Sequence, residues 1–146
     1  MMRRALELAD QAAAMGEVPV GAVVYRPGPI VLGEGFNRRE SDHAPWAHAE
    51  FLAIQQACRA IGDWRLEGCS LAVTLEPCPM CAGLIVQARV PRVLFGATDP
   101  KAGAGGTLMN ILQDSRLNHR CAVIGGVLSD ACAERLTAFF RALRRS

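Results

Sequence analysis

The sequence has 146 residues, of which 51% are hydrophobic and 21% are charged, and its formal net charge is +2. This length suits one compact domain and is short for two, while the composition excludes a disordered or fibrous chain. The weak net charge gives no general argument for a nucleic-acid or membrane partner. We therefore expect one globular domain over residues 1–146, and any charged partner must be inferred from where the basic residues lie.

The amino-terminal segment lacks the features of an export signal. Glu7 and Asp10 interrupt it where a secretory peptide needs an unbroken apolar stretch. No apolar run in the chain reaches the ~20 residues that a membrane span requires. We therefore expect a soluble, cytoplasmic protein with no membrane partner, whose thiols stay reduced. Four cysteines stand singly among apolar neighbours and are expected to be small core residues: Cys58, Cys69, Cys121 and Cys132.

The first part of the chain predicts a helix followed by a β-hairpin. Residues 3–15 carry apolar side chains at helical spacing, and Gly16 is a typical stop. Two runs rich in β-branched residues, 20–25 and 30–37, lie on either side of the turn sequence Arg-Pro-Gly-Pro. These runs predict two paired strands.

The central part predicts a helix, a strand, a second helix and another strand. Apolar residues recur at helical spacing from His48 to about Ile61, and Gly62 ends the segment. The run 69–75 is a buried-strand candidate that leads into a cysteine-containing stretch and a helix through residue 88. The run 92–97 repeats the strand pattern.

The last part predicts a loop, a strand and a final helix. Glycines and alanines in residues 98–106 allow the backbone to approach a ligand closely, although flexibility alone explains such a composition equally well. The run 121–127 predicts the last strand. The final helix is expected to carry an apolar stripe of Cys132, Leu136, Phe139, Phe140 and Leu143.

This order of elements predicts an α/β fold with one mixed sheet. Five strands are expected, and the intervening helices should pack on both faces of the sheet. The expected architecture is therefore a three-layer α/β/α domain.

Cys78 and Cys81 form a C-x-x-C pair within the stretch TLEPCPMCAG, residues 74–83. Such a pair can be a redox couple, half of a structural zinc site, or two ligands of a catalytic zinc. A structural site normally takes four protein ligands, and no second pair is present. A redox motif would lie near the first strand and helix, whereas this pair follows the third predicted strand. The catalytic site is therefore favoured.

His48 is the best candidate for a third ligand. It lies in Ala-His-Ala-Glu at the start of the second predicted helix, with Glu50 two residues later. Alone, this would indicate ordinary helix capping. Together, H-x-E and P-C-x-x-C start two successive helices, whose amino ends can converge on one ion. Three ligands leave an open position for water, and Glu50 can carry its proton if His48 lies in the cap or first turn.

These motifs resemble those of the zinc-dependent nucleoside and nucleobase deaminases, whose signature is H-x-E followed by P-C-x-x-C. The resemblance implies one Zn²⁺ per chain, held by His48, Cys78 and Cys81. It also implies the mechanism: a zinc-activated water attacks the ring carbon that bears the amine. Glu50 then moves a proton from this water to the ring nitrogen and to the departing ammonia.

The resemblance to one branch, the bacterial tRNA-specific adenosine deaminases, covers nearly the whole chain. It implies a cytidine-deaminase-like α/β/α fold with a central mixed five-stranded sheet, and a homodimer. It also implies a tRNA anticodon stem-loop as the substrate, with the wobble adenosine of an arginine tRNA converted to inosine. The matching segments are VPVGAVV (18–24), GEGFN (33–37), AHAE (47–50), TLEPCPMCAG (74–83), FGATDPKAGAGG (95–106), NHR (118–120) and FFRALRR (139–145).

The same resemblance implies substrate contacts outside the metal site. Ordinary structural roles are available to several of these residues, such as turn capping by Asn37 and Asp99 or a helix-end charge for the arginines. Lys101 is the chain's only lysine, which favours a specific contact. The implied roles are a hydrogen bond to the flipped base for Asn37, a pocket wall for Val20, anticodon contacts for Asp99 and Lys101, and positions near the flanking bases for Asn118 and His119. Because the net charge is only +2, we expect phosphate contacts to fall to local cations, namely Lys101, Arg141, Arg144 and Arg145.

One departure from this branch is Trp46, which stands where threonine is expected. Two alternatives to tRNA deamination also remain open. A guanine or free-nucleoside deaminase of the same fold would share the zinc ligands but would not need the basic carboxyl end. A non-catalytic, zinc-stabilised RNA-binding module would have no need of Glu50 beside an open coordination position.

Overall fold

A computed structural model describes all residues from 1 to 146 and contains one five-stranded mixed sheet with strand order β2-β1-β3-β4-β5. β1 is antiparallel to both β2 and β3, whereas β3, β4 and β5 run parallel. The strands are β1 (Gly21–Arg26), β2 (Ile30–Phe36), β3 (Ser70–Leu75), β4 (Arg92–Ala97) and β5 (Ala122–Ile124).

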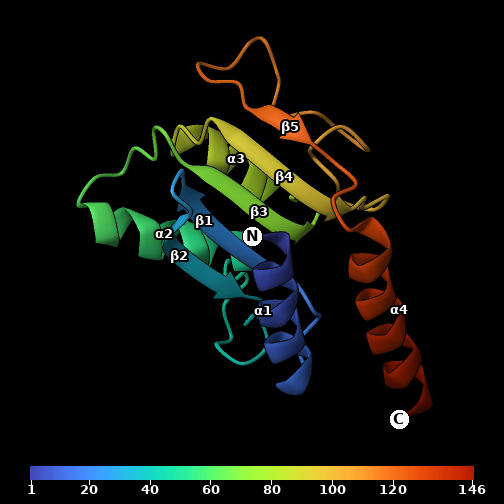
Figure 1. Ribbon diagram of the computed structural model, residues 1–146. Helices are drawn as coiled ribbons and strands as arrows, with labels where there is room; N and C mark the ends of the chain where they lie inside the picture. The colour runs from blue at the N-terminus through green and yellow to red at the C-terminus, as the bar shows by residue number, and fades with distance from the viewer.

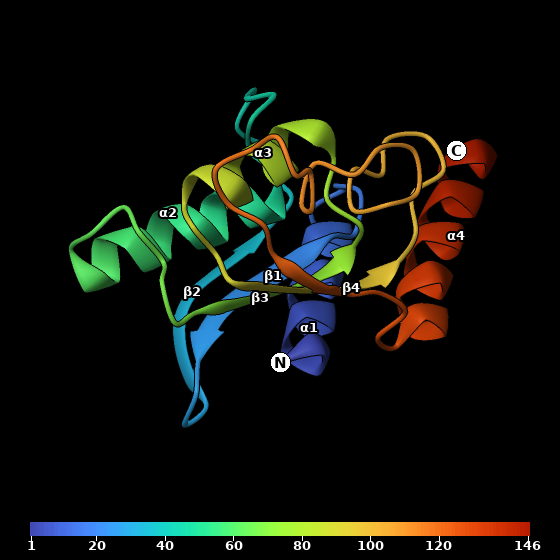
Figure 2. The ribbon, with the colours of Figure 1, turned by 90° about the horizontal axis from the view of Figure 1, so that it is seen from above.

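Helices cover both faces of this sheet, as Figures 1 and 2 show. α2 (Ala49–Ile61) and α3 (Pro79–Gln87) lie on one face, while α1 (Met2–Ala14) and the first half of α4 (Ser129–Arg145) lie on the other. The predicted three-layer architecture with five strands is therefore confirmed. None of these helices is long and apolar enough to span a membrane.

Close packing of β2 on α2 fixes the position of the amino end of α2. A Cβ atom on Gly33 would collide with the backbone of Ala53, and one on Gly35 would lie 2.5 Å from the carbonyl oxygen of Ala49. Only glycine therefore allows the helix to lie this close to the strand. The helix is held where residues 48–50 face the carboxyl end of β3.

The last strand is shorter than the sequence predicts. β5 covers Ala122–Ile124, whereas the prediction extended to residue 127. Gly126 has a φ of +83° and its amide donates to the carbonyl of Gly96 at 3.2 Å, so the chain turns here toward α4. The predicted strand was too long because this glycine pair leaves the extended conformation.

The predicted apolar stripe of α4 is only partly buried. Cys132 is buried, Leu136 and Phe139 are half-buried, and Phe140 and Leu143 are 41% and 57% exposed. Figure 1 shows the reason, because the carboxyl half of α4 projects beyond the sheet. The predicted stripe is therefore present on α4, but only its amino-terminal half packs against the sheet.

The single cysteines follow the prediction with one exception. Cys69, Cys121 and Cys132 are buried, but Cys58 is half-buried near the end of α2.

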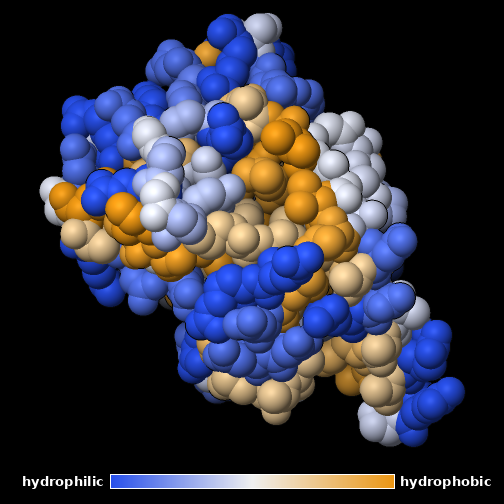
Figure 3. All heavy atoms as spheres, in the orientation of Figure 1, coloured by the Kyte–Doolittle hydropathy of each residue, from blue (hydrophilic) through white to orange (hydrophobic).

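Figure 3 shows an apolar band over the sheet between α1 and α4. It includes a groove lined by Met1, Met2, Tyr25, Ala72, Leu94, Val127 and Leu128.

Candidate metal centre and active-site pocket

The amino ends of α2 and α3 meet beside the carboxyl end of β3. His48 is the N-cap of α2 and Cys78 is the N-cap of α3, both with extended backbone conformations. Pro79 occupies the first turn of α3, where its fixed φ favours helix initiation, and Cys81 follows in the same turn. Neither N-cap side chain makes a capping hydrogen bond, so both can take part in a metal site.

The three side chains converge with spacing that suits one metal ion. His48 Nδ1 lies 3.5 Å from the Sγ atoms of both Cys78 and Cys81, and the three donor atoms lie within 4.8 Å of one another. Tetrahedral Zn²⁺, with bonds of about 2.3 Å to sulfur and 2.0–2.1 Å to nitrogen, separates such atoms by about 3.5 Å. Two thiolates and one imidazole are also donors that zinc prefers. The site therefore fits Zn²⁺.

The two thiols differ in their affinity for protons. Hydrogen bonds from Cys81 and His48 lower the pKa of Cys78 to about 4. The same hydrogen bond with Cys78, together with burial, raises the pKa of Cys81. Zinc is ligated by thiolates, so its binding would also require Cys81 to lose its proton.

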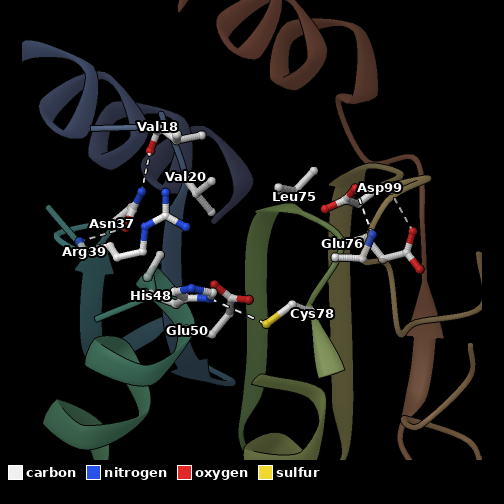
Figure 4. Close-up of a pocket in the computed structure, with 12 residues that line it drawn as sticks. Val18, Val20, Asn37, Arg39, His48, Glu50, Leu75, Glu76, Cys78 and Asp99 are labelled. Atoms are coloured by element: carbon white, nitrogen blue, oxygen red, sulfur yellow. Dashed lines mark hydrogen bonds between the residues drawn. The ribbon is translucent and has the colours of Figure 1, made fainter. Parts of the chain in front are cut away.

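Glu50 lies in the first turn of α2, beside His48. Its side chain is buried, and burial raises the pKa of its carboxyl group to about 7. Figure 4 shows the carboxylate between His48 and Cys78, directed at the same space. A carboxyl group whose pKa lies near neutrality can both accept and return a proton. His48 lies in the cap, the position that the sequence argument required.

A cavity of about 230 Å³ opens in front of these residues. This is smaller than the ~300–1,000 Å³ pockets of drug-sized ligands and suits a small planar ring. Its lining comes from the segments just before β1 and just after β2, the carboxyl end of β3 and the amino ends of α2 and α3, with one wall from the loop after β4. The lining residues are Val18, Val20, Asn37, Arg39, His48, Ala49, Glu50, Leu75, Glu76, Cys78, Asp99 and Ala102.

Asn37 presents a fixed amide to this cavity. Its Nδ2 donates to the carbonyl of Val18 at 3.2 Å, and its Oδ1 accepts from the backbone amide of Arg39 at 3.0 Å. The side chain is buried, so these bonds determine which way the amide points. Val20 lies next to it in the pocket wall, as Figure 4 shows.

Several residues implied by the sequence lie outside the cavity. Lys101 and Asn118 are exposed on loops. The ring Nε2 of His119 lies 2.7 Å from the carbonyl oxygen of Val90, a contact that anchors its loop to the end of α3. The remaining three residues are exposed on the projecting half of α4 and make no ion pair: Arg141, Arg144 and Arg145.

Sequence reasoning did not single out six of the lining residues. Arg39 lies two positions after Asn37, and Glu76 lies two positions before Cys78, so proximity to a motif was the available signal for both. The other four gave no chemical signal in the sequence: Val18, Ala49, Leu75 and Ala102.

The sequence matches the MafB19-like deaminase family over residues 1–144. It is 53% identical over 144 residues to the tRNA-specific adenosine deaminase of Bacillus subtilis (strain 168), covering 99% of this chain and 89% of that relative. The chain belongs to the tRNA-specific adenosine deaminase family. This deaminase is therefore an enzyme, and the interpretation as a non-catalytic RNA-binding module is excluded.

Solved structures support this placement of the deaminase. A tRNA:A34 deaminase, studied for A-to-I editing at the wobble position, superimposes with a TM-score of 0.88 at 40% identity, covering 92% of this chain and 97% of that one. A guanine deaminase from Nitrosomonas europaea superimposes with a TM-score of 0.81 at 26% identity, covering 94% and 81%. The deaminase thus shares its cytidine-deaminase-like fold with a tRNA deaminase and with a guanine deaminase.

Proposed function

We propose that this enzyme hydrolyses the exocyclic amine of the wobble adenosine in a tRNA anticodon and converts it to inosine, with an arginine tRNA as the expected substrate. The observation that carries the proposal is the convergence of His48, Cys78 and Cys81 with the buried carboxyl of Glu50 at one base-sized cavity. The family to which the chain belongs supports adenosine as the base.

His48, Cys78 and Cys81 would hold one Zn²⁺ by their imidazole nitrogen and two thiolates. When bound, zinc lowers the pKa of a coordinated water toward neutrality and thereby supplies a nucleophile. Because the protein offers three ligands at this point, one coordination position stays open for this water.

Glu50 carries the protons of the reaction. Its carboxylate takes one proton from the attacking water and gives it to the ring nitrogen. It then takes the second proton from the oxygen that has added to the ring carbon and gives it to the amine, which departs as ammonia. Burial raises its pKa to about 7, which lets both the charged and the neutral form be reached at the operating pH. Because Glu50 is buried, this proton is also kept from bulk water.

Asn37 and Val20 would hold the base over these groups. The amide of Asn37 is already oriented by Val18 and Arg39, so a base that enters the cavity finds a preformed polar partner. Bases in an anticodon loop are single-stranded, and turning one into a pocket costs less there than in a duplex. Adenine in such a loop is therefore a suitable substrate.

Residues around the cavity would make the contacts to RNA outside it. Lys101 and Asp99 lie on the loop beside the cavity, and Asn118 and His119 follow in the next loop, where flanking nucleotides would lie. Exposed cations without an acidic partner are free to bind phosphates. We assign this role to Lys101, Arg141, Arg144 and Arg145.

We further propose that residues 1–146 form one zinc-dependent deaminase domain that acts as a homodimer in the cytoplasm. An ammonia-release assay on an anticodon stem-loop, free adenosine, cytidine and guanine tests the substrate class. The stem-loop should have the highest kcat/KM. Preference for guanine or a free nucleoside would instead favour the alternative of a guanine or free-nucleoside deaminase of the same fold.

A further inference from the structure

Glu76 has a buried carboxyl group that takes no part in the proposed reaction. It follows the last residue of β3, precedes Cys78 by two positions, and is 2% exposed. It also lines the cavity. A buried carboxylate that contributes no chemistry must have a structural or positioning purpose, because its burial is unfavourable unless it is well hydrogen-bonded.

The hydrogen-bond partners of Glu76 all come from one loop. Its Oε1 accepts from the backbone amide of Asp99 at 3.1 Å, and its Oε2 accepts from the amides of Gly105 and Thr107, each at 3.0 Å. The hydroxyl of Thr107 donates to Oε1 as well. One carboxylate thus binds both ends of the segment 99–107. Hydrogen bonds to a charged acceptor are stronger than those between neutral groups.

The loop encloses this carboxylate with no spare room. A Cβ atom on Gly103 would lie 2.5 Å from the Cδ and Oε1 atoms of Glu76. The adjacent amide of Ala104 donates to the carbonyl of Pro77 at 2.8 Å. The loop is therefore packed directly on the connection between β3 and Cys78.

The anchored loop supplies part of the cavity wall. Asp99 and Ala102 line the cavity, and Lys101 lies between them on the exposed side. The Oδ1 of Asp99 accepts from the amides of Lys101 at 2.9 Å and Ala102 at 3.2 Å, which fixes the turn. Figure 4 shows Glu76 next to Asp99, on the side of the cavity opposite Asn37.

We propose that Glu76 is a positioning residue for RNA, which holds the segment 98–107 as a preformed wall and acts through Asp99 and Lys101. It contributes to substrate binding and not to metal binding or proton transfer. A loop that is already ordered loses less conformational entropy when RNA binds. This inference rests on the proposed function, since it concerns contacts with an RNA substrate.

Glu76→Gln is the most direct test. Glutamine keeps the size of the side chain but replaces one acceptor oxygen with an NH₂ group, so at least one loop amide loses its partner. Hydrogen exchange at the amides of Asp99, Gly105 and Thr107 should become faster by about tenfold or more. The KM for the anticodon stem-loop should rise by about tenfold, while kcat and the zinc content stay at parental values.

Gly103→Ala disturbs the same contact from the loop side. Its added methyl group displaces the loop from Glu76, so this variant should reproduce the faster exchange and the higher KM. The added methyl group would also lie 2.5 Å from the carbonyl oxygen of Asp99, so this variant disturbs the loop itself as well. The double variant should still be less impaired than the sum of the two single variants, because both changes affect the contact between Glu76 and the loop. Gly83→Ala in α3 is the matched control, since a Cβ atom there meets no atom within 4 Å. The control should keep parental exchange and KM.

Hydrogen exchange needs no substrate, so it tests the anchoring even if the RNA assignment fails. Failure of the parent to deaminate a stem-loop would refute the proposed function. Unchanged exchange or unchanged KM in Glu76→Gln would refute the positioning role, as would zinc loss or a fall confined to kcat. If Glu76→Gln does not fold, Thr107→Val removes only the hydroxyl donor, and it should show a smaller change in the same two measurements.

Discussion

Glu50 is the residue on which the proposed proton transfers depend. Glu50→Gln should keep the fold and one zinc per chain but lower kcat by about 100-fold or more, because the amide preserves the shape of the side chain but cannot carry a proton. Single-turnover rates on an anticodon stem-loop, measured beside zinc stoichiometry, check this. A variant with parental kcat would show that another group moves the proton.

Cys78 is a half-buried member of the proposed metal-ligand set and the N-cap of α3. Cys78→Ala should lose zinc and unfold at a lower temperature, because metal binding and folding are coupled. Metal analysis and thermal unfolding measure both effects. Cys132→Ala is the control, since this buried thiol lies in the core beneath α4 and should not affect the zinc content. Zinc retained in Cys78→Ala would contradict the ligand set.

At the scale of elements, sequence periodicity predicted the helices and most strand limits within one or two residues. The compound motif also predicted that the amino ends of α2 and α3 meet, because it assigned His48 and Cys78 to one ion. It could not predict the contact between Glu76 and the segment 98–107, which depends on how the loop after β4 folds back in space. Periodicity also could not predict how much of the apolar stripe of α4 is buried, because it does not reveal that half of α4 lies beyond the sheet.

The projecting half of α4 carries the proposed phosphate contacts. Replacing Arg141, Arg144 and Arg145 with alanine should weaken stem-loop binding and reduce the slope of log K against log salt by up to about 0.7 per lost contact. Zinc content should not change. Arg59→Ala removes an exposed, unpaired charge at the far end of α2 and is the control for each single arginine variant. If the parent and the triple variant bound the stem-loop equally across a salt titration, these arginines would not contact phosphates and would be only charges at a helix end.

At the scale of the whole molecule, Glu17 links α1 to the loop that follows β2. Its buried carboxylate accepts from the backbone amides of Ser41 at 2.6 Å and Glu40 at 3.3 Å. Burial alone would raise the pKa of Glu17, but these bonds outweigh it, so the pKa lies below its ordinary value of 4.5. The carboxylate therefore stabilises the fold above about pH 4.5, and this contribution is lost as the pH falls through the folded-state pKa.

Glu17→Gln should consequently lower the free energy of unfolding at pH 7 by about 1–3 kcal/mol. Below about pH 4.5 the difference from the parent should shrink, because the parent's carboxylate becomes protonated there. Urea unfolding at several pH values gives both quantities. If the difference in the free energy of unfolding between Glu17→Gln and the parent stayed constant across the acid range, the charge of Glu17 would not contribute to stability.

The arrangement of the whole molecule supports one central claim, that a single adenine enters the cavity from an anticodon loop. The most direct measurement compares ammonia release from two stem-loops that differ only at the wobble position, with adenosine in one and guanosine in the other. The account predicts one equivalent of ammonia from the first, inosine at that position alone, and none from the second. Equal release from both, or inosine elsewhere in the loop, would contradict it.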